Sequence, residues 1–143
     1  MDTAALIVPT ATLVCLTLAV SISLVIYRFC LVRRGLVHSG YFKLNKGGKP
    51  PKRHQALEHN YSNLFEVPIL FYTIVAIAIA TQHIDQFLVL LAWLFVGFRF
   101  AHTLIHVIYN NIIHRLFVFF AAYVTVGIMW FRVVSDILLT TSS

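Results

Sequence analysis

Acidic residues are scarce in this sequence, and so are charged residues in general. Only five Asp and Glu stand against eleven Lys and Arg in 143 residues, and charged residues make up 11% of the chain. Hydrophobic residues make up 59%, and the mean hydropathy of +0.84 is well above that of a soluble domain. This composition excludes a soluble globular protein and predicts a membrane protein.

Cysteine is also rare, which excludes two classes of small protein. Cys15 and Cys30 both fall in the first apolar run. They are too few, and too deep in that run, for a disulfide framework or a cysteine-based metal motif. We find no internal repeat and no low-complexity segment, and the helix-breaking stretch "NKGGKPPKR" at residues 45–53 is the one clear linker.

Four long apolar runs are present, near residues 4–32, 56–81, 84–109 and 112–139. Each is long enough to cross a bilayer core of about 30 Å, which takes roughly 20 helical residues. We therefore predict an all-α integral membrane four-helix bundle that forms one domain over residues 1–143, with a basic loop near 33–55. The first run differs from a cleaved signal peptide, because Asp2 stands where a basic segment belongs and the apolar stretch is too long.

Positive charge is concentrated in one loop. Eight of the eleven Lys and Arg residues fall between Arg28 and Arg53, whereas Asp2, Asp85 and Asp136 stand at the opposite ends of the apolar runs. This asymmetry follows the positive-inside rule, so it predicts a cytoplasmic loop with both termini outside. A basic loop beside a membrane also attracts anionic lipid headgroups, and we predict membrane lipids rather than nucleic acid as its partners.

The predicted topology can be tested with a cysteine placed at Ser39, inside the basic loop. We expect this cysteine to resist an impermeant thiol reagent in intact cells, because the loop faces the cytoplasm. Labelling from outside the cell would refute the topology.

Polar side chains recur at helical spacing in the second and third runs. His59, Asn63 and Glu66 follow an i, i+4, i+7 pattern, with Asn60 beside them. The third run carries a second set spaced i, i+3, i+7 and i+11, which consists of Arg99, His102, His106 and Asn110. If the two helices are antiparallel neighbours, Glu66 and Arg99 lie at similar depth, Asn63 levels with His102, and His59 levels with His106.

An ionised residue inside a membrane costs several kcal/mol unless it meets a partner or a wet cavity. We therefore expect Glu66 to face Arg99, next to a local break at Pro68, which leaves the Leu64 carbonyl without its helical donor. The pair fits either a functional site or an ion pair that only fixes helix register. A metal or haem site at His102 and His106 is a further alternative, although the Arg99 cation opposes it.

Two stretches resemble the bacterial branch of the MAPEG family, the membrane-associated proteins of eicosanoid and glutathione metabolism. They are "HNYSNLFEVPILFY" at residues 59–72 and "AWLFVGFRFAHTLIHVIYNNIIHR" at residues 92–115, and the likeness covers roughly residues 50–132. The resemblance implies a homotrimer of four-helix bundles, set in a bacterial inner membrane. It also implies polar sites between subunits near the cytoplasmic side, where glutathione, the co-substrate, is added to lipophilic electrophiles or reduces lipid hydroperoxides.

Carried over residue by residue, the resemblance makes Arg115 the catalytic residue, because an arginine beside the thiol stabilises the reactive thiolate. It places the glutathione-binding residues at Asn63, Glu66, Arg99, His102 and His106, and it predicts no metal. Arg33 or Arg34, at the end of the first helix, would add a further cation.

Four positions depart from the pattern of glutathione-using members. His59 and Ser62 stand where arginines are common, and His106 and Phe119 stand where tyrosines are common. The site therefore has fewer cations and hydroxyl donors than a glutathione transferase or peroxidase of this family. The alternative is a non-catalytic trimer that binds a lipid or another lipophilic small molecule, or that serves only as structure.

Overall fold

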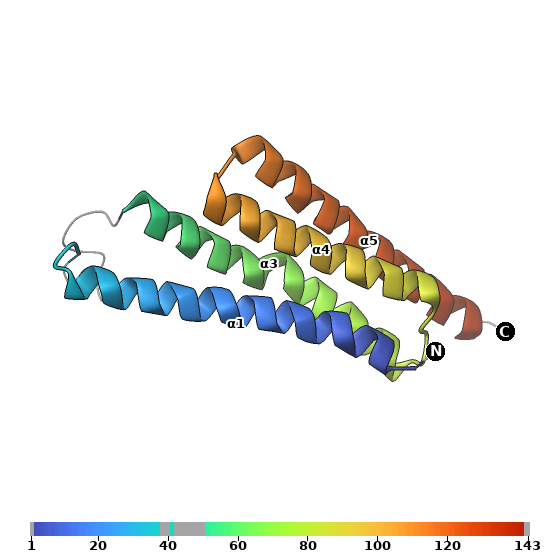
Figure 1. The fold of residues 1–143 in the computed structure, drawn as a ribbon. Coiled ribbons are helices and arrows are strands. Elements are labelled where there is room, and N and C mark those ends of the chain that lie inside the picture. The colour runs from blue at the N-terminus through green and yellow to red at the C-terminus, as the bar shows by residue number, and fades with distance from the viewer. Residues whose placement is uncertain (1, 38–40, 42–50, 142–143) are drawn as a thin grey trace.

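The fold, seen in a computed structural model, consists of four helices in the part of the chain that is described, which is residues 2–37, 41 and 51–141. The helices are α1 (Ala4–Arg33), α3 (Lys52–Ala80), α4 (Gln86–Ile108) and α5 (Ile112–Thr141) (Figure 1). This confirms the predicted all-α four-helix architecture. Ser39 and most of the predicted basic loop lie outside the described residues.

The ends of α3 and α4 follow from local sequence. Pro51 stands directly before α3 with an extended backbone, so the helix begins at Lys52, four residues before the start of the apolar run. The Asp85 side chain caps α4 by accepting a hydrogen bond of 2.7 Å from the Leu88 amide. Between these helices Gln82 has a φ of 62°, in the left-handed region that a tight turn requires.

Helices that follow one another along the chain run antiparallel, so α1 and α4 point toward one end of the bundle and α3 and α5 toward the other (Figure 1). α4 packs against both α1 and α5, and α3 contacts all three other helices. Both termini lie at the same end of the bundle as the α3–α4 turn, which we call the acidic end because it carries Asp85 (Figure 1). The opposite end holds the last turn of α1, the first turn of α3 and the α4–α5 turn, and we call it the basic end.

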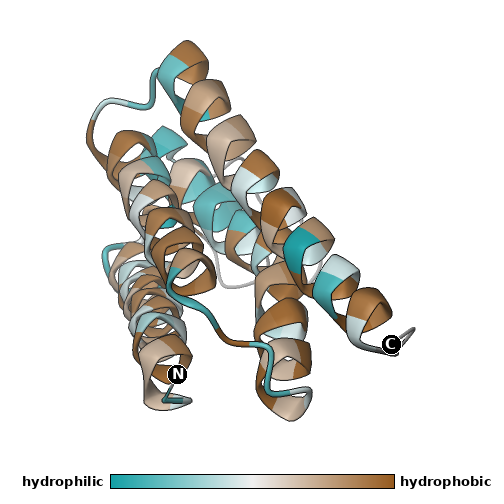
Figure 2. Cartoon of the chain, turned by 90° about the vertical axis from the view of Figure 1, so that its right-hand side faces the viewer, coloured by the Kyte–Doolittle hydropathy of each residue, from teal (hydrophilic) through white to brown (hydrophobic). Residues whose placement is uncertain are grey.

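The core lies between the helices, and the outer faces are also apolar. Phe71 of α3 and Phe95 of α4, both fully buried, stack with ring centroids 4.6 Å apart. On the outside, large side chains such as Phe117 and Phe131 are about three-quarters exposed, at 75% and 76%. All four helices are long and apolar enough to cross a membrane (Figure 2). A hydrophobic exterior of this extent is typical of a surface that contacts lipid or another protein chain.

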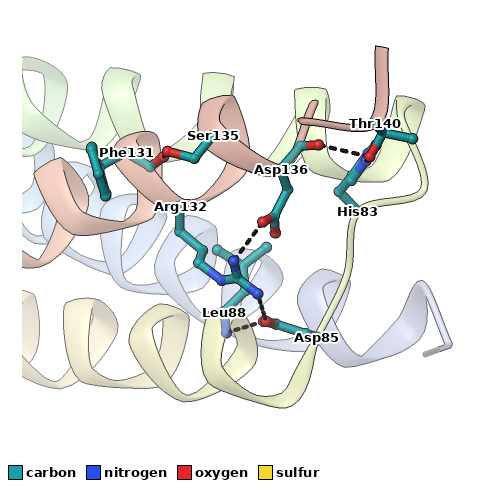
Figure 3. Close-up of polar contacts among 8 residues, drawn as sticks. All are labelled: His83, Asp85, Leu88, Phe131, Arg132, Ser135, Asp136 and Thr140. Atoms are coloured by element: carbon teal, nitrogen blue, oxygen red, sulfur yellow. Dashed lines mark hydrogen bonds and ion pairs between the residues drawn. The ribbon is translucent and has the colours of Figure 1, made fainter. Parts of the chain in front are cut away.

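At the acidic end, Arg132 of α5 links two carboxylates (Figure 3). Its guanidinium lies 3.0 Å from Asp85 Oδ2 and 2.5 Å from Asp136 Oδ1. Partial burial raises the pKa of Asp85, but the Leu88 amide and the Arg132 guanidinium together lower it below its ordinary value. Ionised Asp85 therefore joins the start of α4 to the last turns of α5.

We expect Asp85→Ala to lower the free energy of unfolding by about 0.5–2 kcal/mol, because it removes the helix cap as well as the ion pair. Asp85→Asn is the matched control, since asparagine caps equally well but carries no charge. Its cost should be smaller, because both partners of the ion pair are about 40% exposed, at 40% and 43%, and screened by solvent. Denaturant titration in detergent measures both changes, and equal losses would contradict the capping role.

The same contact predicts a pH dependence. Because the pKa of Asp85 is lower in the folded state, its stabilising contribution is present at neutral pH. It is lost as the pH falls from the ordinary aspartate pKa through the lower folded value. The wild type should therefore lose more stability on acidification than Asp85→Asn, as thermal unfolding at pH 7 and pH 3 would show.

Candidate functional site

The α4–α5 turn positions the first polar groups of the site. Asn110 adopts a φ of 47°, a left-handed conformation that asparagine tolerates well. The Asn111 side chain then accepts hydrogen bonds from the amides of Ile113 at 2.9 Å and His114 at 3.3 Å, which starts α5. This tight reversal brings Arg115, in the first turn of α5, back against the last turn of α4.

Arg115 is held by two acceptors. Its Nη1 atom lies 3.1 Å from Nε2 of His106 and donates to Oδ1 of Asn110 over 3.2 Å. A guanidinium can only donate, so Nε2 of His106 is the acceptor and the ring carries its proton on Nδ1. Within the described residues no carboxylate pairs with Arg115. The site therefore holds an oriented cation that forms no ion pair with an acidic side chain of the described residues.

A cavity of about 210 Å³ opens in front of this cation. Its lining comes from α3, α4 and α5 and consists of Asn63, His102, Ile112, Arg115, Leu116 and Phe119. Asn63 and His102, which were expected to lie at the same depth, line this one cavity. We call it the Arg115 cavity.

One wall of the Arg115 cavity is formed by aromatic rings. His102 has its ring centroid 5.6 Å from that of His106 and 6.0 Å from that of Phe119. Both histidines are 2% exposed, and their Nδ1 atoms have no hydrogen-bond partner in the part of the chain that the structure describes. Phe119 offers an apolar ring where the family resemblance leads one to expect a hydroxyl. Each buried imidazole thus keeps one ring nitrogen without a partner among the described residues close to the cavity.

Arg99 lies deeper in the bundle and is fully buried. Its Nη2 atom donates to the backbone carbonyl of Asn63, while Nε and Nη1 have no partner among the described residues. The expected ion pair with Glu66 is not formed within the chain, because no carboxylate of the described residues lies within 4.0 Å of Arg99. Glu66 is exposed and acts on Arg99 only through longer-range Coulomb attraction.

The rotation of α3 explains this correction. Leu64, Val67 and Phe71 define the buried face of the helix, and Asn60 shares it. Asn60 is fully buried and accepts a hydrogen bond of 3.4 Å from the Thr103 hydroxyl of α4. The polar residue that α3 turns most directly toward α4 is therefore Asn60. Its outward face carries exposed polar residues that include His59, Ser62 and Glu66.

A second polar cluster, absent from the sequence interpretation, joins α1 to α3 at the basic end. Arg28 Nη2 lies 2.6 Å from Glu58 Oε1, and Arg28 Nε lies 3.2 Å from His54 Nε2. His54 is fully buried and stacks on Tyr27, with ring centroids 6.2 Å apart. The i, i+4 spacing of His54 and Glu58 was the available sequence signal for this cluster.

Two further proposals from the sequence, a cation at Arg33 or Arg34 and a metal site at His102 and His106, are not supported by the structure. Arg33 and Arg34 are exposed at the end of α1 and do not line the Arg115 cavity. The metal alternative gains no support, since no group of three or more His, Cys, Asp or Glu side chains in the described residues could hold an ion. Arg115 would in any case oppose a cation beside His106.

The sequence of the chain was compared with models of known protein families. A family model described as the MAPEG family matches residues 6–135, nearly the whole chain. The chain belongs to the MAPEG family. No curated protein and no solved structure matches it. The family match, together with the four long apolar helices, makes this MAPEG protein an integral, multi-pass membrane protein.

Proposed function

We propose that this MAPEG protein binds glutathione in the Arg115 cavity and transfers it to lipophilic electrophiles or uses it to reduce lipid hydroperoxides. The supporting observation is Arg115, a cation fixed by His106 and Asn110 in an open cavity without an acidic partner among the described residues. An anionic ligand is the natural complement of such a group. Glutathione is the anion that the family resemblance implies, and membership of the MAPEG family supports this choice.

In this proposal glutathione supplies the sulfur nucleophile, and the protein stabilises its thiolate form. Arg115 lowers the pKa of the bound thiol by offering its guanidinium to the sulfur anion, and the thiol proton leaves to solvent at the open mouth. His106 and Asn110 keep the guanidinium in place without neutralising it. Asn63 and His102 line the cavity and bind the peptide part. The thiolate then forms a C–S bond with an electrophilic carbon. In a substitution the leaving group departs with the electron pair of the broken bond, and in an addition the π pair moves onto the activating group and takes up a proton from solvent.

We further propose that the functional unit is a homotrimer. His59, Ser62 and Glu66 are exposed on α3 of the single chain, inside a helix long and apolar enough to cross a membrane. Exposure of these groups to hydrocarbon would be costly, whereas a neighbouring copy can cover them. We expect mass measurement in mild detergent to give three subunits, and a stable monomer would contradict this assembly.

Titration of the purified protein with glutathione tests the proposed function. We expect thiolate absorbance and proton release on binding, followed by turnover when a lipophilic electrophile or hydroperoxide is added. S-methylglutathione is the matched control, since it occupies the site but has no ionisable thiol. Absence of glutathione binding at millimolar concentration would refute the proposal.

A second function, a trimer that binds a lipid or another lipophilic molecule without catalysis, is favoured by one observation. Phe119 lines the Arg115 cavity and packs on His102, so that wall offers no hydroxyl donor to a developing anion. In this case glutathione gives no thiolate signal, while an apolar ligand raises the unfolding temperature. The same titration therefore separates the two functions.

A further inference from the structure

A different cavity, of about 440 Å³, lies on the other side of α3 and α4. Its walls include Ala19, Ser23 and Tyr27 of α1, Arg53 of α3, and Leu104 and Val107 of α4. We call it the α1–α4 groove. It shares no lining residue with the Arg115 cavity, and its volume lies within the range of about 300–1,000 Å³ of small-molecule sites.

The groove is polarised along the membrane normal. α1 runs toward the basic end, so Ala19 lies deep and Tyr27 lies near the mouth, beside Arg53 in the first turn of α3. The deep hydroxyl of Ser23 donates to the Ala19 carbonyl over 2.7 Å, which satisfies it within the helix. Thr103, which also lines the groove, donates to Asn60. The deep walls therefore demand no hydrogen bond and suit a hydrocarbon chain.

Among the described residues that line the groove, Arg53 is the one cation, and it lies at the mouth. Glu58 pairs with Arg28 at 2.6 Å, and Tyr27 is held in place by its stack on buried His54. Arg53 is exposed and makes no ion pair or hydrogen bond within the described part of the chain. The carboxylate nearest in sequence is thus already used by Arg28, and Arg53 is left to meet an external anion.

We propose that the α1–α4 groove binds one anionic phospholipid, with an acyl chain between α1 and α4 and the phosphodiester at Arg53. Leu104 is 55% exposed and Val107 is 38% exposed, so the groove is continuous with the apolar outer surface that faces lipid. A lipid can therefore enter sideways from the bilayer. Basic pockets between membrane helices recognise anionic headgroups through this combination of a tail slot and a cation.

Lipid titration followed by native mass spectrometry tests the proposal on the purified protein in detergent. We expect dioleoyl phosphatidylglycerol to bind about fivefold more tightly than dioleoyl phosphatidylcholine, the effect of one arginine at an anionic surface. Arg53→Gln should reduce this preference to about one, and Arg53→Lys should retain most of it. Val107→Trp should fill the slot and weaken the binding of both lipids.

Lys52→Gln is the matched control, because Lys52 is another exposed cation one residue away that does not line the groove. It should leave the preference unchanged, and soluble sn-glycerol 3-phosphate should not displace the lipid. Each of three results would overturn the proposal. The first is that the wild type binds both lipids equally, and the second is that Lys52→Gln and Arg53→Gln reduce the preference by the same amount. The third is that Val107→Trp changes the number of subunits and leaves the number of bound lipids per subunit unchanged. Helical circular dichroism confirms that each variant is folded.

Discussion

Arg99→Ala is expected to lower the free energy of unfolding by about 3–5 kcal/mol. Arg99 is fully buried, and its side chain is among the largest in the core, so truncation leaves a cavity between α3 and α4. The change also removes the guanidinium that donates to the Asn63 carbonyl. Denaturant titration in detergent, followed by circular dichroism, measures the loss. Leu94→Ala is the control on the same helix, where a side chain that is 44% exposed should cost far less.

A double-mutant cycle then asks whether Glu66 balances the Arg99 charge. Arg99→Leu keeps much of the packing volume but leaves the Glu66 carboxylate without its cation, and Glu66→Leu leaves the buried cation without a carboxylate. We expect the double variant to lose less than the sum of the single losses, with a coupling of about 1–2 kcal/mol. This is less than for a contact pair, since the charges interact only at longer range. Ser62→Leu controls for added hydrophobicity on the same exposed face, and additive losses would show that the charges do not interact.

The fold followed from the sequence because the thickness of a membrane sets the length of its helices. Each observed helix overlaps the apolar run that predicted it, and the clearest difference is at the start of α3. Residues 52–55 are polar, so a hydropathy pattern does not include them in the apolar run. They are nevertheless helical, and the helix begins directly after Pro51. Hydrophobic length thus locates a span, while local backbone chemistry sets where it begins.

The rotation of α3 could not be predicted from the same pattern. Asn60 and Glu66 lie about 120° apart around a helix of 3.6 residues per turn, so the polar residues of this segment cover too wide an arc to define one face. The structure resolves the ambiguity by packing, because Leu64, Val67 and Phe71 form the buried face. The consequence is that Glu66 faces outward and forms no ion pair with Arg99 of its own chain.

The position of Arg115, in contrast, depends on a turn that the sequence shows clearly. The Asn110 and Asn111 pair supplies both the left-handed residue and the cap that a tight helix reversal needs. The contact between Arg115 and His106 follows from that reversal. What the sequence alone could not show is that Arg115 uses the histidine as an acceptor, which fixes the ring proton on Nδ1.

Arg115→Leu is expected to lower turnover with glutathione by about 10²–10³-fold while the protein keeps its assembly and helical content. The guanidinium sits in the first turn of α5 and is only partly buried, so its removal leaves no charge stranded in the core. Its loss should raise the pKa of the bound thiol, because no other cation lines the Arg115 cavity in the described residues. The pH–rate profile should therefore shift to higher pH, and a merely structural arginine would not produce such a shift.

Two variants make this prediction specific to the guanidinium. Arg115→Lys retains a charge but loses the planar fork that meets His106 and Asn110 together, so we expect intermediate turnover and an intermediate shift of the pH profile. His114→Gln changes the adjacent residue, whose ring contacts Tyr109, and should leave turnover unchanged. If Arg115→Leu retains both turnover and the wild-type pH profile, the catalytic role fails even where glutathione binds. If glutathione binds but neither the wild type nor any variant turns over, the Arg115 cavity is a binding site without chemistry.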